Sequence, residues 1–114
     1  MSDGIRVASV DDIPEGEAVS IPPEVTGLMD PVGIFHDDGE FFALDDICTH
    51  EEAYLSEGWI EDGEVECPLH ASRFCLRTGE VRGLPATVDA KTFRVEVRDG
   101  AIWMYPDEPA RSKD

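Results

Sequence analysis

Two short clusters of cysteine and histidine constrain this chain more than any other feature of its sequence. The first is Cys48-Thr49-His50, and the second, Cys67-Pro68-Leu69-His70, follows after 16 intervening residues. Each cluster offers one thiolate and one imidazole, which are soft or borderline donors that suit iron or zinc better than calcium or magnesium. The two clusters together predict a metal site with four protein ligands, Cys48, His50, Cys67 and His70.

The length and charge of the chain limit the number of its domains and the kinds of partner that it can bind. Its 114 residues leave room for one domain with one modest core. A formal charge of −17 at pH 7 argues against nucleic acid or an anionic membrane as a partner. No apolar run approaches the ~18 residues of a membrane span, and the N-terminal segment lacks the layout of a signal peptide. We therefore expect a soluble, cytoplasmic protein that is monomeric.

Short alternations of apolar and polar residues predict an all-β fold. Thr92–Arg98 alternates in this way, and Asp99-Gly100 turns it into Ala101–Tyr105, which predicts a hairpin. A second hairpin is predicted from residues 32–36 and 40–44. Many short strands favour an antiparallel sandwich or barrel. Further strands are expected at residues 5–10, 18–21, 65–67 and 73–76, and a functional loop at 48–58.

The distribution of the four ligands bears on which metal they hold. A zinc module usually takes a cysteine pair from one knuckle and a second pair of ligands from another. Here each cluster supplies one cysteine and one histidine, as a binuclear iron–sulfur centre requires when one iron takes both thiolates and the other both imidazoles. A structural zinc site, or two buried thiols beside incidental histidines, is the alternative.

The pattern C-x-H, about sixteen residues, C-x-x-H resembles that of the Rieske [2Fe–2S] family. The likeness runs from about residue 32 to residue 104. Residues 67–79 are similar to the second cluster loop and following turn of the small Rieske ferredoxins that serve aromatic-ring dioxygenases. Residues 55–58 and 83–86 point the same way, the latter as the proline-containing loop that the family places over its cluster.

The resemblance implies a fold, a cofactor and a role for each ligand. Cys48 and Cys67 would hold the inner iron of one [2Fe–2S] cluster, and His50 and His70 the outer iron near the tip. The implied fold is an antiparallel Rieske domain of stacked small sheets with a two-loop subdomain that binds the cluster. The domain would cover residues 1–106, with cluster loops near 48–53 and 67–73 and a polar tail at 107–114.

The sequence departs from the membrane-anchored respiratory Rieske proteins at three informative positions and agrees with them at a fourth. Ala53 and Leu69 stand where those relatives carry a disulfide, so that bond cannot form here. Phe74 replaces a tyrosine that hydrogen-bonds a cluster-ligand sulfur, whereas Ser72 matches a serine that they direct toward a bridging sulfide. Fewer hydrogen bonds to sulfur stabilise the reduced cluster less, so we predict a potential toward the low end of the roughly −150 to +300 mV Rieske range.

The chain lacks what an oxygenase or a dehydrogenase needs. Only His36 remains beside the four ligands, too few for a site of two histidines and a carboxylate, and there is no G-x-G-x-x-G motif. We therefore expect a one-electron carrier, not an enzyme. It would accept electrons from an FAD-containing NADH:ferredoxin reductase and pass them to a terminal oxygenase component. The alternatives are a small Rieske-like subunit of a nitrite reductase and a zinc-stabilised interaction module.

Other conspicuous residues are assigned structural roles. Cys75 exceeds the ligands needed and is expected to be a small buried hydrophobe. His36 is expected to be an ordinary surface histidine, and Phe74, Trp59 and Trp103 to lie in the core. The acidic excess has two interpretations, a solvated surface or a field that steers the protein toward basic faces of redox partners.

Overall fold

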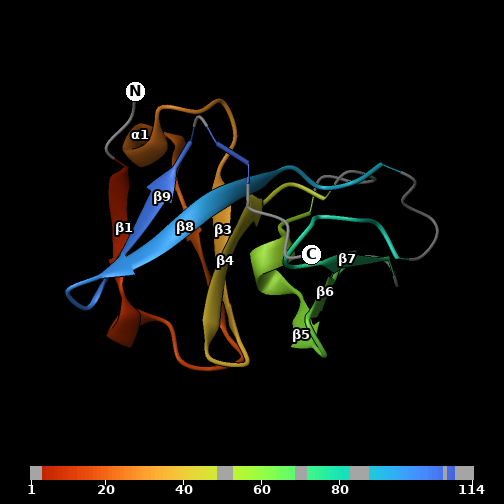
Figure 1. Cartoon of the computed structure of the whole chain (residues 1–114). Coiled ribbons are helices and arrows are strands. Elements are labelled where there is room, and N and C mark those ends of the chain that lie inside the picture. Colours follow the sequence, from red (N-terminus) through yellow and green to blue (C-terminus); the bar gives the residue numbers. More distant parts are fainter. Residues whose placement is uncertain (1–3, 49–52, 69–71, 83–87, 107, 110–114) are drawn as a thin grey trace.

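A computed structural model of the chain describes residues 4–48, 53–68, 72–82, 88–106, 108 and 109 (Figure 1). These residues form two antiparallel sheets, a six-stranded sheet of order β1-β9-β8-β4-β3-β2 and a three-stranded sheet of order β5-β6-β7. The all-β prediction is confirmed. The strands are β1 Ile5–Ser9, β2 Ala18–Ile21, β3 Val32–Asp37, β4 Glu40–Asp45, β5 Trp59–Glu61, β6 Glu64–Glu66, β7 Arg73–Cys75, β8 Thr92–Arg98 and β9 Ala101–Tyr105.

Three hairpins in the described chain share one kind of turn. Asp-Gly joins β3 to β4, β5 to β6 and β8 to β9, and in each turn both residues have positive φ. That is the geometry of a two-residue turn whose twist matches the twist of the strands it joins. The hairpin of β8 and β9 has the predicted bounds, and β3 and β4 each extend one residue beyond their predicted ends.

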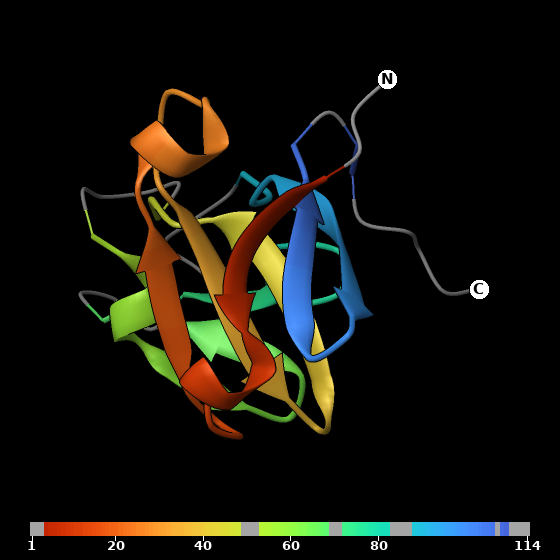
Figure 2. The ribbon, with the colours of Figure 1, turned by 90° about the vertical axis from the view of Figure 1, so that its left-hand side faces the viewer.

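The interior consists of two apolar clusters that meet at β3 and β4. On β3, Ile34 belongs to the cluster enclosed by the curled six-stranded sheet, whereas its neighbour Phe35 faces the small sheet. Ala43 and Leu44 on β4 divide in the same way, because successive strand residues point to opposite faces. Figure 2 shows the six-stranded sheet curling round on itself, with the small sheet behind it. The hairpin of β3 and β4 therefore joins the two units.

Some short elements were not predicted from the sequence. They are β5, the four-residue helix α1 (Pro23–Thr26) and the 3-10 helices Val10–Asp12 and Leu55–Glu57. The last of these lies inside the segment 48–58, which was predicted to be a loop. No helix in the described part of the chain is long and apolar enough to cross a membrane.

The prediction that three aromatic residues lie in the core is right for Phe74 and wrong for Trp59. Phe74 is fully buried, Trp103 is partly buried, and the side chain of Trp59 is 62% exposed. The strand β5 turns its middle residue, Ile60, toward the core, so Trp59 must face outward. His36 is also more enclosed than expected, because its Nδ1 donates to the Ile13 carbonyl at 2.7 Å.

Candidate metal centre

The first of the two predicted ligand loops is closed at its base by backbone pairing. Ile47 and Tyr54 form an antiparallel bridge, and the amide of Cys48 donates to the carbonyl of Ala53 at 2.8 Å. Cys48 is therefore the first residue of a closed loop, and Ala53 is the last.

The second loop is closed in the same way at the end of β6 and β7. Glu66 pairs with Arg73, and the amide of Cys67 donates to the carbonyl of Ser72 at 2.9 Å. Here, too, a cysteine opens a closed loop that returns to its partner five residues later. The two predicted thiolate ligands thus occupy equivalent positions in two loops of equal length.

Both thiols lie in one water-poor environment. Cys48 is 3% exposed and Cys67 is fully buried, and both belong to the apolar cluster between the two sheets. Leu55, Val65 and Phe74 belong to the same cluster. The structure forms no disulfide among the three cysteines, all of which it describes. Two buried thiolate donors in a shared apolar cluster fit the cysteine-bound iron of a [2Fe–2S] centre.

The other two predicted ligands, His50 and His70, lie outside the described residues, as do Leu69 and residues 83–86. Within the described residues there is no group of three or more histidine, cysteine, aspartate or glutamate side chains that could hold a metal ion. The structure therefore brings Cys48 and Cys67 into one cluster and leaves the position of the two histidines as a prediction.

Sequence reasoning missed a buried carboxylate that supports the first loop. Asp46 is fully buried, and its Oδ1 accepts the amide of Ser56 at 2.7 Å, while its Oδ2 accepts the Ser56 hydroxyl at 2.8 Å. The Asp46 carbonyl also accepts the amide of Leu55 at 2.7 Å. These bonds tie the segment before Cys48 to the segment after Ala53. Nothing in the sequence separates Asp46 from the other acidic residues.

A glycine supports the second loop by allowing a close backbone approach. A Cβ on Gly58 would lie 1.9 Å from the carbonyl oxygen of Glu66, the residue that precedes Cys67. Only a residue without a side chain leaves room for that carbonyl. Gly58 thus packs the end of the first loop segment against the start of the second.

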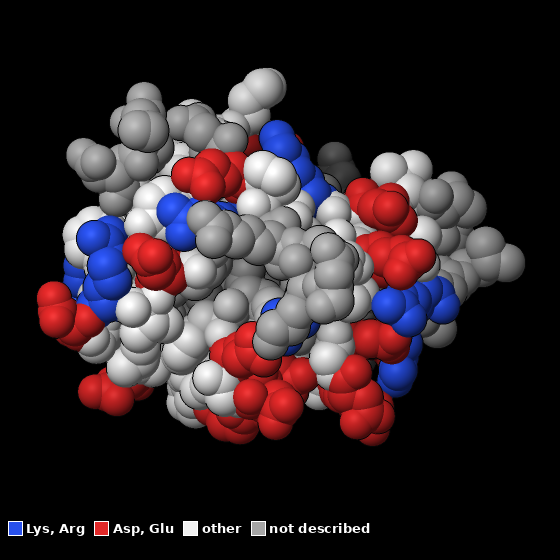
Figure 3. All heavy atoms as spheres, viewed as in Figure 1, with Lys and Arg blue, Asp and Glu red and all other residues white. Residues whose placement is uncertain are grey.

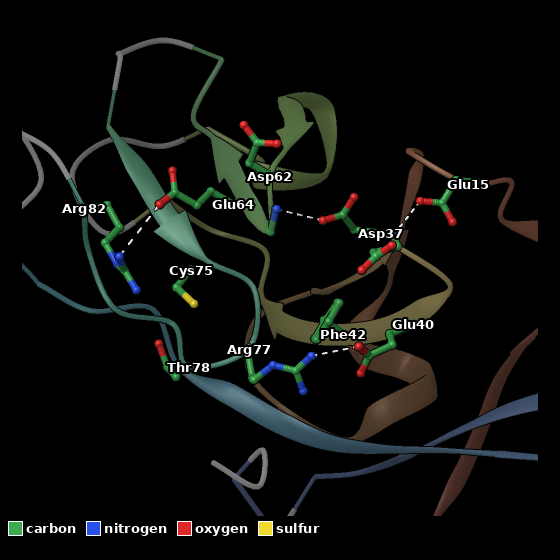
Figure 4. A pocket seen from close by; sticks show the side chains of 12 residues that line it. Glu15, Asp37, Glu40, Phe42, Asp62, Glu64, Cys75, Arg77, Thr78 and Arg82 are labelled. Carbon is green, nitrogen blue, oxygen red and sulfur yellow. Dashed lines mark hydrogen bonds and ion pairs between the residues drawn. The ribbon is translucent and has the colours of Figure 1, made fainter. Parts of the chain in front are cut away.

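A hollow on the described surface is lined by residues of three turns. It has a volume of about 640 Å³ and lies between the turn of β3 and β4, the turn of β5 and β6, and the turn after β7 (Figure 4). Of the predicted ligands that the structure describes, neither Cys48 nor Cys67 is among its lining residues. Its labelled lining residues are Glu15, Asp37, Glu40, Phe42, Asp62, Glu64, Cys75, Arg77, Thr78 and Arg82.

Cys75 forms part of that hollow and is only partly buried, so the expectation of a buried hydrophobe is wrong. Desolvation raises the pKa of its thiol, but hydrogen bonds from the Thr78 hydroxyl and from the amides of Thr78 and Arg77 outweigh it. The resulting pKa lies below the ordinary value of a thiol.

Two equally closed loops, each opening on a buried cysteine, provide the thiolate half of the predicted iron–sulfur site. Residues 4–94 match the family described as the Rieske [2Fe-2S] domain. The chain therefore belongs to the Rieske [2Fe–2S] family, in which it is a ferredoxin: an electron carrier with one [2Fe–2S] cluster, and not an enzyme.

Relatives and solved structures of similar length support that assignment. The chain is 47% identical over 105 residues to the 3-phenylpropionate/cinnamic acid dioxygenase ferredoxin subunit of Photorhabdus laumondii, covering 90% of this chain and 93% of that one. It is 44% identical to the subunit of the same name from Escherichia coli K12, over 88% of this chain and 91% of that one.

Among solved structures, the carbazole 1,9a-dioxygenase ferredoxin of Nocardioides aromaticivorans IC177 superposes with a TM-score of 0.83 at 34% identity, covering 92% of this chain and 99% of that one. A ferredoxin solved in a complex with the reduced oxygenase of carbazole 1,9a-dioxygenase gives a TM-score of 0.82 at 30% identity, covering 95% of this chain and 96% of that one.

Proposed function

We propose that this ferredoxin takes single electrons from an FAD-containing NADH:ferredoxin reductase and delivers them to the terminal oxygenase of an aromatic-ring dioxygenase system. The similarity to dioxygenase ferredoxin subunits over nearly the whole of both chains carries this proposal. The ferredoxin solved with its oxygenase supports the second half of the transfer. We further propose that the protein works in the cytoplasm as a monomer.

In this proposal Cys48 and Cys67 hold the inner iron, and His50 and His70 hold the outer iron. The equivalent positions of the two cysteines at the start of their loops support the first pair. The spacing of the two histidines supports the second pair. When bound, the cluster supplies reversible one-electron chemistry.

The chain's own residues set the surroundings of that chemistry. The apolar side chains around Cys48 and Cys67 exclude water, which strengthens electrostatic interactions within the site. Phe74 is buried in the same cluster and offers no hydroxyl to a sulfur. A reduction potential toward the low end of the Rieske range remains our prediction.

The dioxygenase systems named for the relatives guide the choice of partner. The relatives of 44–47% identity serve 3-phenylpropionate/cinnamic acid dioxygenases, whereas the solved ferredoxins of carbazole 1,9a-dioxygenase are 30–34% identical. We therefore propose an oxygenase of the first kind as the acceptor. A small nitrite reductase subunit also superposes, with a TM-score of 0.76, but at 23% identity that likeness shows the fold alone.

The first experiment tests the cofactor and its ligands. We expect protein purified without oxygen to contain two irons and two acid-labile sulfides per chain. The reduced protein should give the EPR signal of mixed cysteine and histidine ligation. His70→Ala should lose this signal, whereas Cys75→Ser should keep it. A colourless protein with one zinc per chain, or a native spectrum in His70→Ala, would contradict the ligand assignment.

The second experiment tests electron delivery. The loaded ferredoxin is combined with the reductase and the terminal oxygenase of the Photorhabdus laumondii system, and consumption of NADH and formation of dihydroxylated product are followed. We expect product only when the ferredoxin is present. A protein with an intact cluster that supports no turnover with these partners would contradict the proposed acceptor.

A further inference from the structure

The small sheet has two chemically different faces. Its strand register places Ile60, Val65 and Phe74 side by side on the inner face, against the apolar cluster. Because side chains alternate along a strand, the flanking residues share the outer face. That outer face consists of Trp59, Glu61, Glu64, Glu66, Arg73 and Cys75.

One arginine organises the glutamates of this outer face. Arg73 lies on the edge strand β7, and its three guanidinium nitrogens contact Glu61 at 3.1 Å, Glu64 at 3.3 Å and Glu66 at 3.3 Å. Arg82 also contacts Glu64, at 4.0 Å. Three carboxylates and one guanidinium leave a formal charge of −2 on these four residues. Figure 3 shows acidic side chains on the right of the molecule, with basic side chains among them, and further acidic side chains along the lower edge. The face is therefore negative, and its carboxylates are held in place.

Trp59 stands at the edge of this acidic face and next to the second ligand loop. It pairs with Glu66, which directly precedes Cys67. A single exposed apolar side chain needs no explanation, since folded proteins have many. Trp59 differs because it is a large aromatic residue that lies beside ordered carboxylates and close to the predicted cluster site. Tryptophans in such surroundings are enriched at the centres of protein interfaces.

We propose that this outer face, Trp59 with the glutamates around Arg73, docks the terminal oxygenase. The proposal rests on the proposed function. The complementary surface would be an apolar recess for the indole ring, surrounded by lysine or arginine side chains that face the glutamates. Docking there would bring the oxygenase to the loop that Cys67 opens. The glutamates would mainly raise the association rate, and the buried indole would mainly slow dissociation.

The first test measures binding of the loaded, oxidised ferredoxin to the terminal oxygenase of the Photorhabdus laumondii system. Trp59→Ala should raise the Kd at least tenfold, because interface tryptophans are frequent hot spots. Val97→Ala is the matched control, since Val97 is 49% exposed but lies on β8 of the other sheet. Its Kd should equal that of the wild type. The EPR spectrum and reduction potential of Trp59→Ala should also equal those of the wild type.

The second test addresses the charges. Glu61→Gln should lower the association rate and weaken its dependence on salt, whereas Glu24→Gln on α1 should change neither. Reduction of the ferredoxin by the reductase should proceed at the wild-type rate in Trp59→Ala. If Trp59→Ala slowed reduction by the reductase as much as it weakened binding to the oxygenase, the assignment of this face to the oxygenase would be overturned.

Two outcomes separate this inference from the function on which it rests. A wild-type protein that carries its cluster but fails to bind the oxygenase contradicts the proposed acceptor and the docking face together. A wild-type protein that binds, with Trp59→Ala and Val97→Ala binding equally well, contradicts the docking face alone.

Discussion

The six-stranded and three-stranded sheets are held together by different means. The large sheet has strands of four to seven residues whose apolar side chains alternate, and it encloses its own core. The strands of the small sheet have three residues each, too few to be stable alone. They depend on Gly58, on the Asp46–Ser56 hydrogen bonds and on packing against β3 and β4. The alternation of apolar residues along its strands thus specifies the large sheet, whereas tertiary contacts stabilise the small sheet that carries the second ligand loop.

The largest effect should follow from a methyl group at Gly58. In Gly58→Ala the new Cβ would meet the Glu66 carbonyl, and backbone cannot yield as a side chain does. We expect the free energy of unfolding to fall by about 3 kcal/mol and cluster content to fall with it. Chemical denaturation of the apo protein and iron analysis measure the two effects.

Gly100→Ala is the matched change in the large sheet. Gly100 has φ of +76° in the turn of β8 and β9, but no other heavy atom lies within 4 Å of its Cβ position. The cost should therefore be the strain of a left-handed alanine, about 1 kcal/mol, with the cluster retained. If the two variants lost equal stability and equal iron, the distinction between the two sheets would fail.

The next effect concerns the buried carboxylate. Asp46→Ala would leave the partly buried Ser56 amide and hydroxyl without their acceptor, which should cost about 2 kcal/mol. Asp46→Asn can still accept from that amide through its Oδ1, so most of the stability should return. Thermal unfolding of both apo variants provides the measurement. If the asparagine variant were as unstable as the alanine variant, the hydrogen bond from the Ser56 amide would not be the source of the stability that Asp46 provides.

A smaller effect is expected on the potential of the cluster. Phe74→Tyr would add a hydroxyl where the respiratory relatives place their hydroxyl donor. A hydrogen bond to sulfur that is stronger in the reduced state by about 1 kcal/mol should raise the potential by about 40 mV. Protein-film voltammetry measures this shift. Phe35→Tyr, a buried change in the same apolar cluster but on β3, is the control and should leave the potential unchanged.

The smallest effect lies in the large sheet and depends on pH. The Tyr105 hydroxyl donates to Glu96 and, with Arg94 and Arg98 nearby, holds the pKa of that carboxyl below its ordinary 4.5 despite desolvation. The lowered pKa contributes stability that is present above pH 4.5 and is lost as pH falls through the folded value. Glu96→Gln should therefore flatten the acid side of the stability profile. An unchanged slope between pH 5 and pH 3 would contradict this.

The sequence predicts the large sheet well and the small one incompletely, for physical reasons. The strand β8 alternates over seven residues, so its bounds are predicted correctly. The strand β5 has three residues, of which the aromatic one faces solvent, so periodicity gives neither its existence nor its orientation. Cys48 and Cys67 stand out by residue type. Asp46 and Gly58 do not, because a buried hydrogen bond and a close backbone approach arise only once the chain is folded.

The two sheets each carry one tryptophan, and the two tryptophans differ in exposure, so each sheet has its own fluorescent reporter. The chain has two tryptophans, Trp59 on the small sheet and Trp103 on β9 of the large one. A single-tryptophan variant of either kind would report on one unit alone. Emission from Trp59 should lie at longer wavelength than that from the more enclosed Trp103. The unfolding of the scaffold and of the cluster-bearing unit could then be followed separately, without an added label.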